Sequence, residues 1–149
     1  MSDKIAQKVT NHIKAHDRLI EIFGMEIEET RAGFAKVSMK VGHDHLNAAG
    51  LCHGAALFAL ADVTFALAVN CYGQMALAIE ASINYFRPAK PGDCITAICK
   101  EVFQGKRTGT YLCSLTNAEH KDVAIFKATA FRIDQAPVMV QSRGQHDPK

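Results

Sequence analysis

The sequence predicts an α+β fold in which one curved antiparallel sheet wraps around a single long central helix. A stretch over about residues 52–71 is apolar on almost every side, so a helix there must be covered on almost every side. Segments that alternate apolar and polar residues precede and follow this stretch, as in strands. With 149 residues and 48% hydrophobic content, we expect one compact domain over residues 1–149, with its core at about 20–133.

The N-terminal part of the chain predicts a helix followed by a hairpin. Ser2 can cap a helix over about residues 2–20, in which Ile5, Val9 and Ile13 recur at helical spacing. The segments "MEIEE" and "GFAKVSMKV" then alternate on either side of "TRAG", the pattern of a β-hairpin. The loop "GHDHLNAAG" leads from the hairpin into the long apolar helix.

Four strands are predicted after that helix, which Gly73 is placed to end. The segments "ALAIEASINYF", "CITAICKEVF", "TYLCSLT" and "VAIFKATAFRI" have a period of two and are separated by short turns. We expect them to form an antiparallel meander and to share one sheet with the hairpin, because an isolated hairpin is marginally stable. This element order describes a hotdog fold. The polar tail, about 134–149, is expected to be flexible.

Composition argues against several classes of protein. A formal net charge of +2 does not indicate nucleic acid or a membrane surface as the main partner. Residues 51–69 are long enough to span a membrane, but His53, Asp62 and Thr64 interrupt them. The N-terminal segment lacks the apolar core of a signal peptide. We expect a cytoplasmic protein with reduced thiols, because its five cysteines match no metal or C-x-x-C motif: Cys52, Cys71, Cys94, Cys99 and Cys113.

Asp62 places a carboxylate in the middle of the most hydrophobic predicted helix. Its neighbours three and four residues away, Phe58, Ala59, Phe65 and Ala66, are all apolar. Burial without a charged partner is expected to raise the pKa of Asp62, which would make it a better general base. The alternative is a structural carboxylate held by backbone N–H groups or a hydroxyl.

The start of the same helix offers groups that stabilise negative charge. A helix N-terminus presents unpaired N–H groups and a positive dipole end, and Gly54 has no side chain to shield its N–H from a ligand. Asn47, in the preceding loop, can donate from its amide. We expect His53 to orient Asn47 or the loop rather than to transfer a proton. The alternatives are that Asn47 only shapes a turn, that Gly54 only relieves crowding and that His53 only packs against the loop.

These residues carry a family resemblance. The order of elements, with Asn47, His53-Gly54, Asp62, "INYFRPAKPGD" and "QGKRTG", resembles the hotdog-fold acyl-CoA thioesterases. It is most similar to the branch that includes the phenylacetate-pathway thioesterase, over about residues 20–133. The resemblance implies hydrolysis of an acyl-CoA thioester, with coenzyme A present only as part of the substrate and no separate cofactor.

The resemblance also implies roles for individual residues. The Gly54 N–H and the Asn47 side chain would bind the thioester carbonyl, and Asp62 would be the general base or the nucleophile. It suggests a homotetramer made of two dimers. The sequence departs from the family at Ala55, where a second glycine often follows the histidine, and at Ala78, where some members have Ser or Thr.

Helix geometry predicts that the site is shared between two chains. Gly54 and Asp62 are eight residues apart, which is about 12 Å along one helix and roughly 80° around its axis. One carbonyl group cannot touch both residues. We therefore predict a two-fold dimer in which Gly54 and Asn47 of one chain face Asp62 of the other.

The remaining contacts to the substrate are predicted from residue type and position. Basic side chains suited to the coenzyme A phosphates lie on or beside two turns between strands: Arg87, Lys90, Lys106 and Arg107. An apolar acyl chamber is expected from three residues near the long helix: Leu51, Phe58 and Phe65. The alternative is that the basic residues are solvated turns and that the aromatic residues belong to the core.

Two other functions are compatible with this sequence. A hotdog dehydratase or hydratase would move a proton at carbon with His53 and Asp62, but the helix spacing keeps these residues apart within one chain. A non-enzymatic acyl-CoA binding protein is also possible, since fold does not determine function. No metal is expected, because "HDH" at residues 43–45 lacks further ligands.

Overall fold

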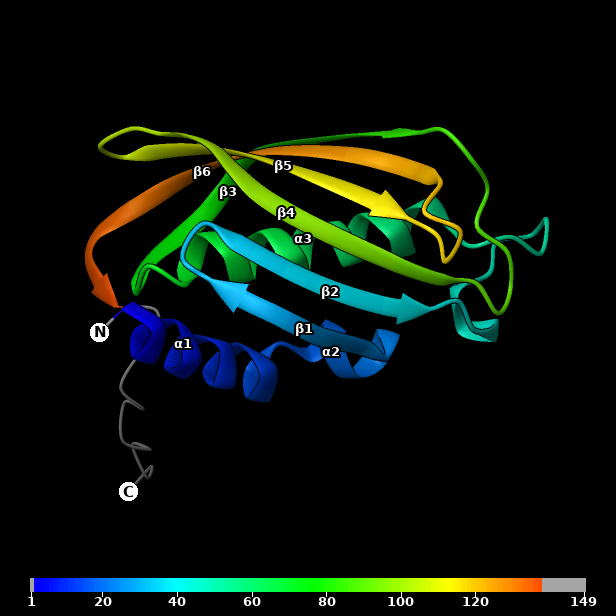
Figure 1. The fold of residues 1–149 in the computed structure, drawn as a ribbon, viewed down its shortest axis with the longest axis horizontal. Helices are drawn as coiled ribbons and strands as arrows, with labels where there is room; N and C mark the ends of the chain where they lie inside the picture. The colour runs from blue at the N-terminus through cyan, green and yellow to red at the C-terminus, as the bar shows by residue number, and fades with distance from the viewer. Residues whose placement is uncertain (1, 138–149) are drawn as a thin grey trace, which may run out of the picture.

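The described part of the chain, residues 2–137, forms one six-stranded sheet, three α-helices and a short 3₁₀ helix (Figure 1). These elements come from a computed structural model that describes residues 2–137. In chain order they are α1 (Ser2–His16), α2 (Arg18–Phe23), β1 (Met25–Arg31), β2 (Phe34–Lys40), η1 (His43–His45), α3 (Gly54–Asn70), β3 (Gln74–Tyr85), β4 (Cys94–Gln104), β5 (Thr108–Thr116) and β6 (Asp122–Pro137).

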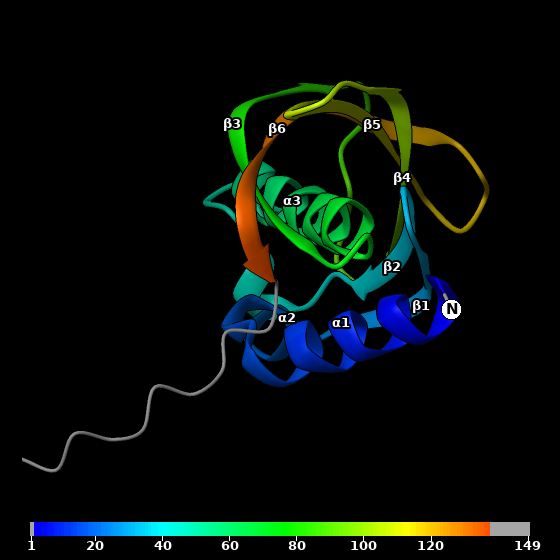
Figure 2. The same ribbon diagram turned by 90° about the vertical axis from the view of Figure 1, so that its left-hand side faces the viewer.

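The sheet curls around α3. All neighbouring strands are antiparallel, in the order β1-β2-β4-β5-β6-β3. Seen along the helix, the strands surround most of α3, and α1 and α2 lie across the remaining side (Figure 2). The predicted α+β hotdog architecture, with a curved sheet around one central helix, is confirmed.

The predicted meander of four strands is wrong in one respect. Only β4, β5 and β6 follow one another as neighbours, because β3 pairs with β6 from Tyr85↔Ala124 to Gln74↔Pro137. The other neighbour of β4 is β2, so the N-terminal hairpin extends the sheet beyond β4 and β1 is the outer strand at that end. A period of two specifies which face of a strand is buried, but it does not choose the strand's partner. As a consequence, β3 is an edge strand.

The predicted N-terminal helix over residues 2–20 is two helices. Asp17 adopts an extended conformation between them, and its carboxylate accepts a hydrogen bond from the Leu19 N–H at 3.1 Å. This is the N-cap that begins α2, and an Asp side chain is well suited to it. The left-handed Gly24, with φ 67°, ends α2. The break lets α1 and α2 follow the curvature of β1 (Figure 1).

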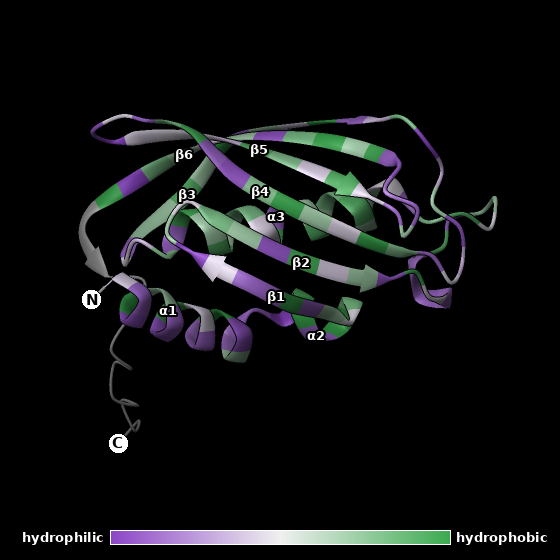
Figure 3. Cartoon of the chain, in the orientation of Figure 1, coloured by the Kyte–Doolittle hydropathy of each residue, from purple (hydrophilic) through white to green (hydrophobic). Residues whose placement is uncertain are grey.

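Helix α3 is the centre of the core. Leu60, Leu67 and Ala68 are fully buried, and the hydropathy colouring is strongly apolar along α3 and hydrophilic along α1 (Figure 3). The hydroxyl of Thr64 donates to the Leu60 carbonyl at 2.6 Å, so this buried polar group is satisfied. The side chain of Asn70 exchanges hydrogen bonds with the backbone at Ala76, which ties the end of α3 to the start of β3.

Strand β6 continues to Pro137, past residue 134 where the flexible tail was predicted to begin. Residues 138–149 lie outside the described part of the chain. No helix within residues 2–137 is both long and apolar enough to cross a lipid bilayer.

The central position of α3 predicts a stability effect. Leu60→Ala should lower the free energy of unfolding by about 2–5 kcal/mol, because it removes a fully buried side chain and leaves a cavity. Ile22→Ala is the control, since Ile22 is 65% exposed, and it should change stability by less than about 0.5 kcal/mol. Urea denaturation of both variants measures the difference. Equal effects would contradict the placement of α3 at the core.

Candidate functional site

The start of α3 presents a hydrogen-bond donor. Gly54 is the first helical residue, and His53 is the N-cap, whose Nδ1 accepts the Ala55 N–H at 3.1 Å. The next two N–H groups, of Ala56 and Leu57, donate to the His53 carbonyl. Within residues 2–137 no group accepts a hydrogen bond from the Gly54 N–H. This donor, at the positive end of the helix dipole, is therefore able to bind an oxygen of a ligand.

His53 is engaged by the backbone rather than by Asn47. Its ring caps α3 and its own N–H donates to the His45 carbonyl at 2.7 Å. An Nδ1 that accepts a hydrogen bond leaves the proton of the neutral ring on Nε2. The expected orientation of the loop by His53 stays a prediction, and among the described residues its hydrogen bonds go to the backbone of Ala55 and His45 rather than to Asn47.

Asn47 shapes the loop before α3 and still has a donor end. Its Oδ1 accepts hydrogen bonds from the N–H groups of Ala49 at 2.9 Å and Leu51 at 3.2 Å. Because the carbonyl oxygen is held in this way, the orientation of the whole amide is set, and its NH₂ group is directed away from the turn. The side chain is exposed, so the NH₂ group can reach a ligand.

A hollow of about 370 Å³ lies at the start of α3 and collects part of the predicted site. Asn47, Leu51, Gly54 and Arg87 all line it. Phe86 follows directly after β3 and adds an apolar wall. Seven of the predicted site residues are not part of this hollow's lining: His53, Asp62, Phe58, Phe65, Lys90, Lys106 and Arg107.

Tyr85, at the end of β3, also belongs to this hollow, and the sequence reasoning missed it. Its hydroxyl donates to the Gly54 carbonyl at 2.8 Å. A β-carbon built at Gly54 would lie 3.0 Å from ring atoms of Tyr85, so the glycine also makes room for the tyrosine. Burial, and then the nearby Cys52, raise the pKa of Tyr85. The signal in the sequence was its place inside "INYFRP", where only the flanking basic residues were considered.

Asp62 lies on the same helix as Gly54 and is half-buried. None of the residues in 2–137 donates a hydrogen bond to its carboxylate, and the nearby Thr64 hydroxyl is directed to the backbone. The pKa of Asp62 is raised, first by burial and second by the negative charge of Asp17. A carboxylate that is neither capped nor paired is costly to bury and is a candidate for a chemical role.

Asp17 is the second residue that sequence reasoning missed. Only the neighbours of Asp62 on its own helix were compared, and they are apolar. The break between α1 and α2 instead places a carboxylate from a different element near Asp62. The signal was the Asp at position 17, which is a typical N-cap residue in the middle of a segment predicted as one helix.

The two predicted chamber phenylalanines are part of the core. Phe65 is 2% exposed and its ring meets that of Tyr111 edge-on, with centroids 5.4 Å apart. Phe58 is partly buried and meets Phe126 edge-on at 5.2 Å. Their packing against β5 and β6 corresponds to the core interpretation, which the sequence left open.

The basic residues lie at two ends of the molecule. Arg87 lines the hollow at the start of α3, and one of its guanidinium nitrogens donates to the Asp122 carbonyl. It also borders a second hollow of about 470 Å³ together with Lys121. Lys106 and Arg107 are on the β4–β5 turn, at the end of the molecule opposite the start of α3 (Figure 1). Lys90 is exposed on the turn before β4.

Neither a metal site nor a reactive thiol at the start of α3 is found among residues 2–137. Within residues 2–137, no group of three or more His, Cys, Asp or Glu side chains could hold a metal ion. In the "HDH" segment, the His45 Nδ1 accepts the Gly42 N–H at 3.0 Å. Burial raises the pKa of Cys52, beside the helix start, to about 11, so this thiol is protonated at neutral pH and is a poor nucleophile.

Comparison with known proteins identifies sequence relatives across most of the chain. The model of the thioesterase superfamily matches residues 49–124. A putative esterase from Archaeoglobus fulgidus is 42% identical over 132 residues, which are 89% of this chain and 86% of the relative. The acyl-coenzyme A thioesterase PaaI of Escherichia coli is 39% identical over 118 residues, which are 79% of this chain and 84% of that protein.

Two solved structures also match most of this chain. The structure of the E. coli PaaI protein, from the phenylacetic acid degradation operon, matches with a TM-score of 0.86 and 35% identity, and covers 89% of this chain and 96% of that chain. A hypothetical thioesterase from Streptococcus pneumoniae, solved with coenzyme A, matches with a TM-score of 0.77 and 32% identity over 83% and 98% of the two chains.

The proximity of Asp17 and Asp62 predicts a pKa effect. Asp17→Asn keeps a residue that can cap α2 but removes the negative charge that raises the pKa of Asp62. The pKa of Asp62 should therefore fall, and any rate that needs its ionised form should begin to rise at a lower pH. A carbon-detected NMR titration of the Asp62 carboxyl measures the shift. Asp44→Asn, at a side chain that is 98% exposed, is the control, and equal shifts in both variants would contradict the specific pairing.

Proposed function

The chain belongs to the thioesterase superfamily and is a thioester hydrolase of the PaaI-like branch, and we propose that it hydrolyses aryl- or medium-chain acyl-CoA at two equivalent sites across a two-fold dimer. The observation that carries this proposal is the separation of two chemical groups on one helix. The Gly54 N–H lies at the start of α3 without an acceptor, and Asp62 lies about two turns further on without a donor. The start of α3 offers a donor for the thioester oxygen but no base, and Asp62 offers a base but no such donor. A complete thioesterase site would therefore combine Gly54 of one chain with Asp62 of another.

The start of α3 would stabilise the thioester oxygen. As water attacks the carbonyl carbon, negative charge develops on the oxygen, and preorganised N–H donors lower the energy of that state. The Gly54 N–H would donate from the helix end, and the Asn47 NH₂ group would donate from the loop that its own Oδ1 rigidifies. Both groups line one hollow.

Asp62 of the partner chain would activate water or attack directly. As a general base it takes a proton from water while the C–O bond forms. The tetrahedral intermediate then collapses, the C–S bond breaks, and the same proton goes to the departing thiolate. As a nucleophile it forms an anhydride that water hydrolyses. The raised pKa of Asp62 favours proton transfer near neutral pH and does not separate the two routes.

The edge strand β3 is the surface we assign to the dimer. The other edge strand, β1, carries Glu26, Glu28, Glu29 and Arg31, and is flanked by α1 and α2. In contrast, β3 exposes Leu77 at 56% and Ile79 at 62%. A long edge strand with exposed apolar residues invites pairing with another strand unless it is covered. A two-fold pairing through β3 would also reverse the partner's helix and bring its middle toward the start of α3.

The same pairing would bring the basic residues together. Lys106 and Arg107 lie far from the Gly54 hollow of their own chain (Figure 1), but a two-fold axis near the middle of β3 moves the partner's β4–β5 turn to that end. Arg87 already lines the hollow, and Lys90 follows on the next turn. These side chains would contact coenzyme A phosphates. Association of two such dimers into a tetramer and a cytoplasmic location, in keeping with five free cysteines, are also part of the proposal.

The alternative functions receive less support. A dehydratase or hydratase would need His53 for proton transfer at carbon, but the Nδ1 of His53 caps α3 and the ring lies about two helical turns from Asp62. A purely binding protein would have no use for a buried, uncapped carboxylate.

The first test is hydrolysis by wild type and Asp62→Asn. We expect wild type to cleave members of an aryl- and alkyl-CoA panel, and Asp62→Asn to lose about 100-fold or more of kcat, because the amide can neither accept a proton nor attack. Loss of the thioester absorbance measures the rate without a thiol dye, which five protein thiols would complicate. Equal rates for both proteins would exclude Asp62 as the catalytic carboxylate.

The second test concerns the dimer. Ile79→Glu should yield folded monomers that lose about 100-fold or more in activity, because Asp62 and Gly54 no longer share a site. Val102→Glu, at a position on β4 that is 55% exposed, should leave both assembly and activity unchanged. Light scattering after gel filtration gives the assembly state. A fully active monomer would rule out the shared site.

A further inference from the structure

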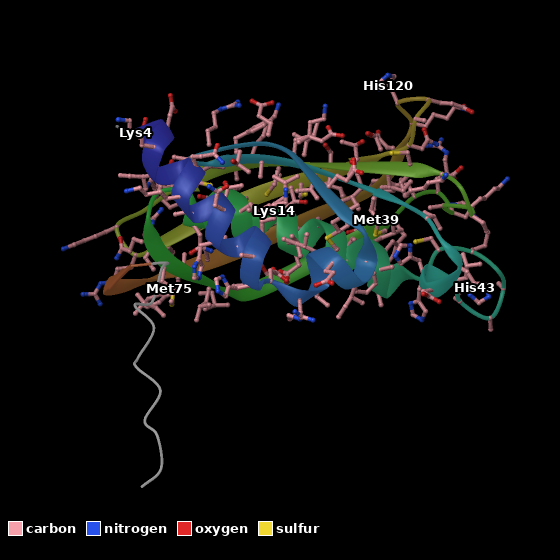
Figure 4. The ribbon with its side chains drawn as sticks, turned by 90° about the horizontal axis from the view of Figure 1, so that it is seen from below. Lys4, Lys14, Met39, His43, Met75 and His120 are labelled. Carbon is pink, nitrogen blue, oxygen red and sulfur yellow. The ribbon has the colours of Figure 1, made fainter. Side chains whose placement is uncertain are left out.

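We infer that the acyl group binds in the hollow between α1, α3 and β3, so that Ile13 of the N-terminal helix determines acyl-chain selectivity. This inference rests on the proposed thioesterase function and names where the acyl part of the substrate lies. The hollow has a volume of about 310 Å³, and its lining combines apolar residues (Ile13, Ala66, Met75, Ala76 and Leu77) with polar ones (His12, His16, Asp17 and Asn70). Figure 4 shows α1 and α2 crossing in front of α3, with Met75 at the edge of the molecule where β3 runs.

The hollow is adjacent to Asp62 by two independent observations. Ala66 and Asn70 follow Asp62 at intervals of four residues on α3, so the three share one face of the helix. Asp17, whose charge acts on Asp62, also lines the hollow. A carbonyl held next to Asp62 therefore has an apolar hollow about one helical turn, or about 6 Å, further along the helix.

The lining fits a short apolar group. Ala66 is a small residue at the position on α3 where a larger one would fill the space, and Met75 is a flexible side chain that adapts to different shapes. The amide of Asn70 is occupied by the carbonyl of Ala66 and the backbone of Ala76, so this lining residue needs no polar group from a ligand. A volume at the low end for small-molecule sites suits a single ring or a medium chain.

The hollow belongs to the same subunit as the carboxylate that would act on the substrate. Asp62 and the hollow belong to one subunit, and the exposed Leu77 places the opening on the β3 edge. In the proposed dimer, the partner's α3 start would hold the carbonyl from outside this edge while the acyl group points inward beneath α1. Phe58 and Phe65, from which the chamber was predicted, pack in the core instead, so α1 supplies a wall that the sequence did not indicate.

The test changes the size of the hollow and measures selectivity. Ala66→Leu should lower kcat/KM for octanoyl-CoA about 10-fold or more relative to butyryl-CoA, since each methylene that no longer fits costs roughly 10–200-fold. Ile13→Ala should shift the preference the opposite way, toward longer chains. Ala15→Leu, on the exposed side of α1, and Ile22→Ala, on α2, make the same chemical changes outside the hollow and should leave the octanoyl-to-butyryl ratio unchanged.

A binding measurement tests the acyl site independently of hydrolysis. In methyl-labelled protein, octanoate should shift the methyl resonances of Ile13 and Met75 and leave Ile22 unchanged. Unchanged selectivity in both folded hollow variants, or octanoate shifts confined to Leu51 and Leu57 at the start of α3, would overturn the assignment. If wild type hydrolyses none of the thioesters, the proposed function is contradicted. The methyl shifts caused by octanoate would still show where the acyl group binds.

Discussion

The structure depends on the burial of a helix that is apolar on all sides. Leu60, Val63 and Phe65 point in different directions from α3 and are all buried, so no single flat sheet could cover them. The sheet has to curl, and α1 and α2 have to lie across the side that the strands leave open (Figure 2). In the sheet that surrounds the helix, β3, the first strand after α3, lies next to the last strand, β6.

The candidate catalytic groups lie where the sheet does not fully cover α3. Backbone donors are satisfied along α3 by the helix itself, and only the start of the helix has an N–H without an acceptor among residues 2–137. Asp62 lies on the face of α3 where the neighbouring elements are a helix break and an edge strand rather than continuous sheet. Both groups are costly for a folded chain to leave unpaired. We interpret that cost as a sign that a substrate and a second chain contact these positions.

The accuracy of the sequence predictions followed the range of the interactions involved. The hairpin, the central helix and the strands were recognised because periodicity is local and reports burial directly. Pairing of β3 with β6 was missed because partner choice depends on curvature of the whole sheet. The single N-terminal helix was wrong because Asp17 begins a new helix with its own side chain, although it stands in a segment with helical periodicity. The contact of Tyr85 with Gly54 joins residues 31 positions apart, and no local pattern indicates it.

The sequence by itself determined the element types, the central apolar helix and the separation of Gly54 from Asp62, because helix geometry converts spacing directly into distance. It also identified the candidate carboxylate, since a charge surrounded by apolar neighbours is visible in the chain. Only the tertiary structure decided which side chains surround that carboxylate. The charge of Asp17 acts on Asp62 through space, residues of α1 line a hollow with Ala66 and Asn70 of α3, and the aromatic residues near Asp62 in the helix turn away into the core. Neighbours on one helix are set by a repeat of 3.6 residues, whereas neighbours across elements are set by how the whole sheet closes around α3.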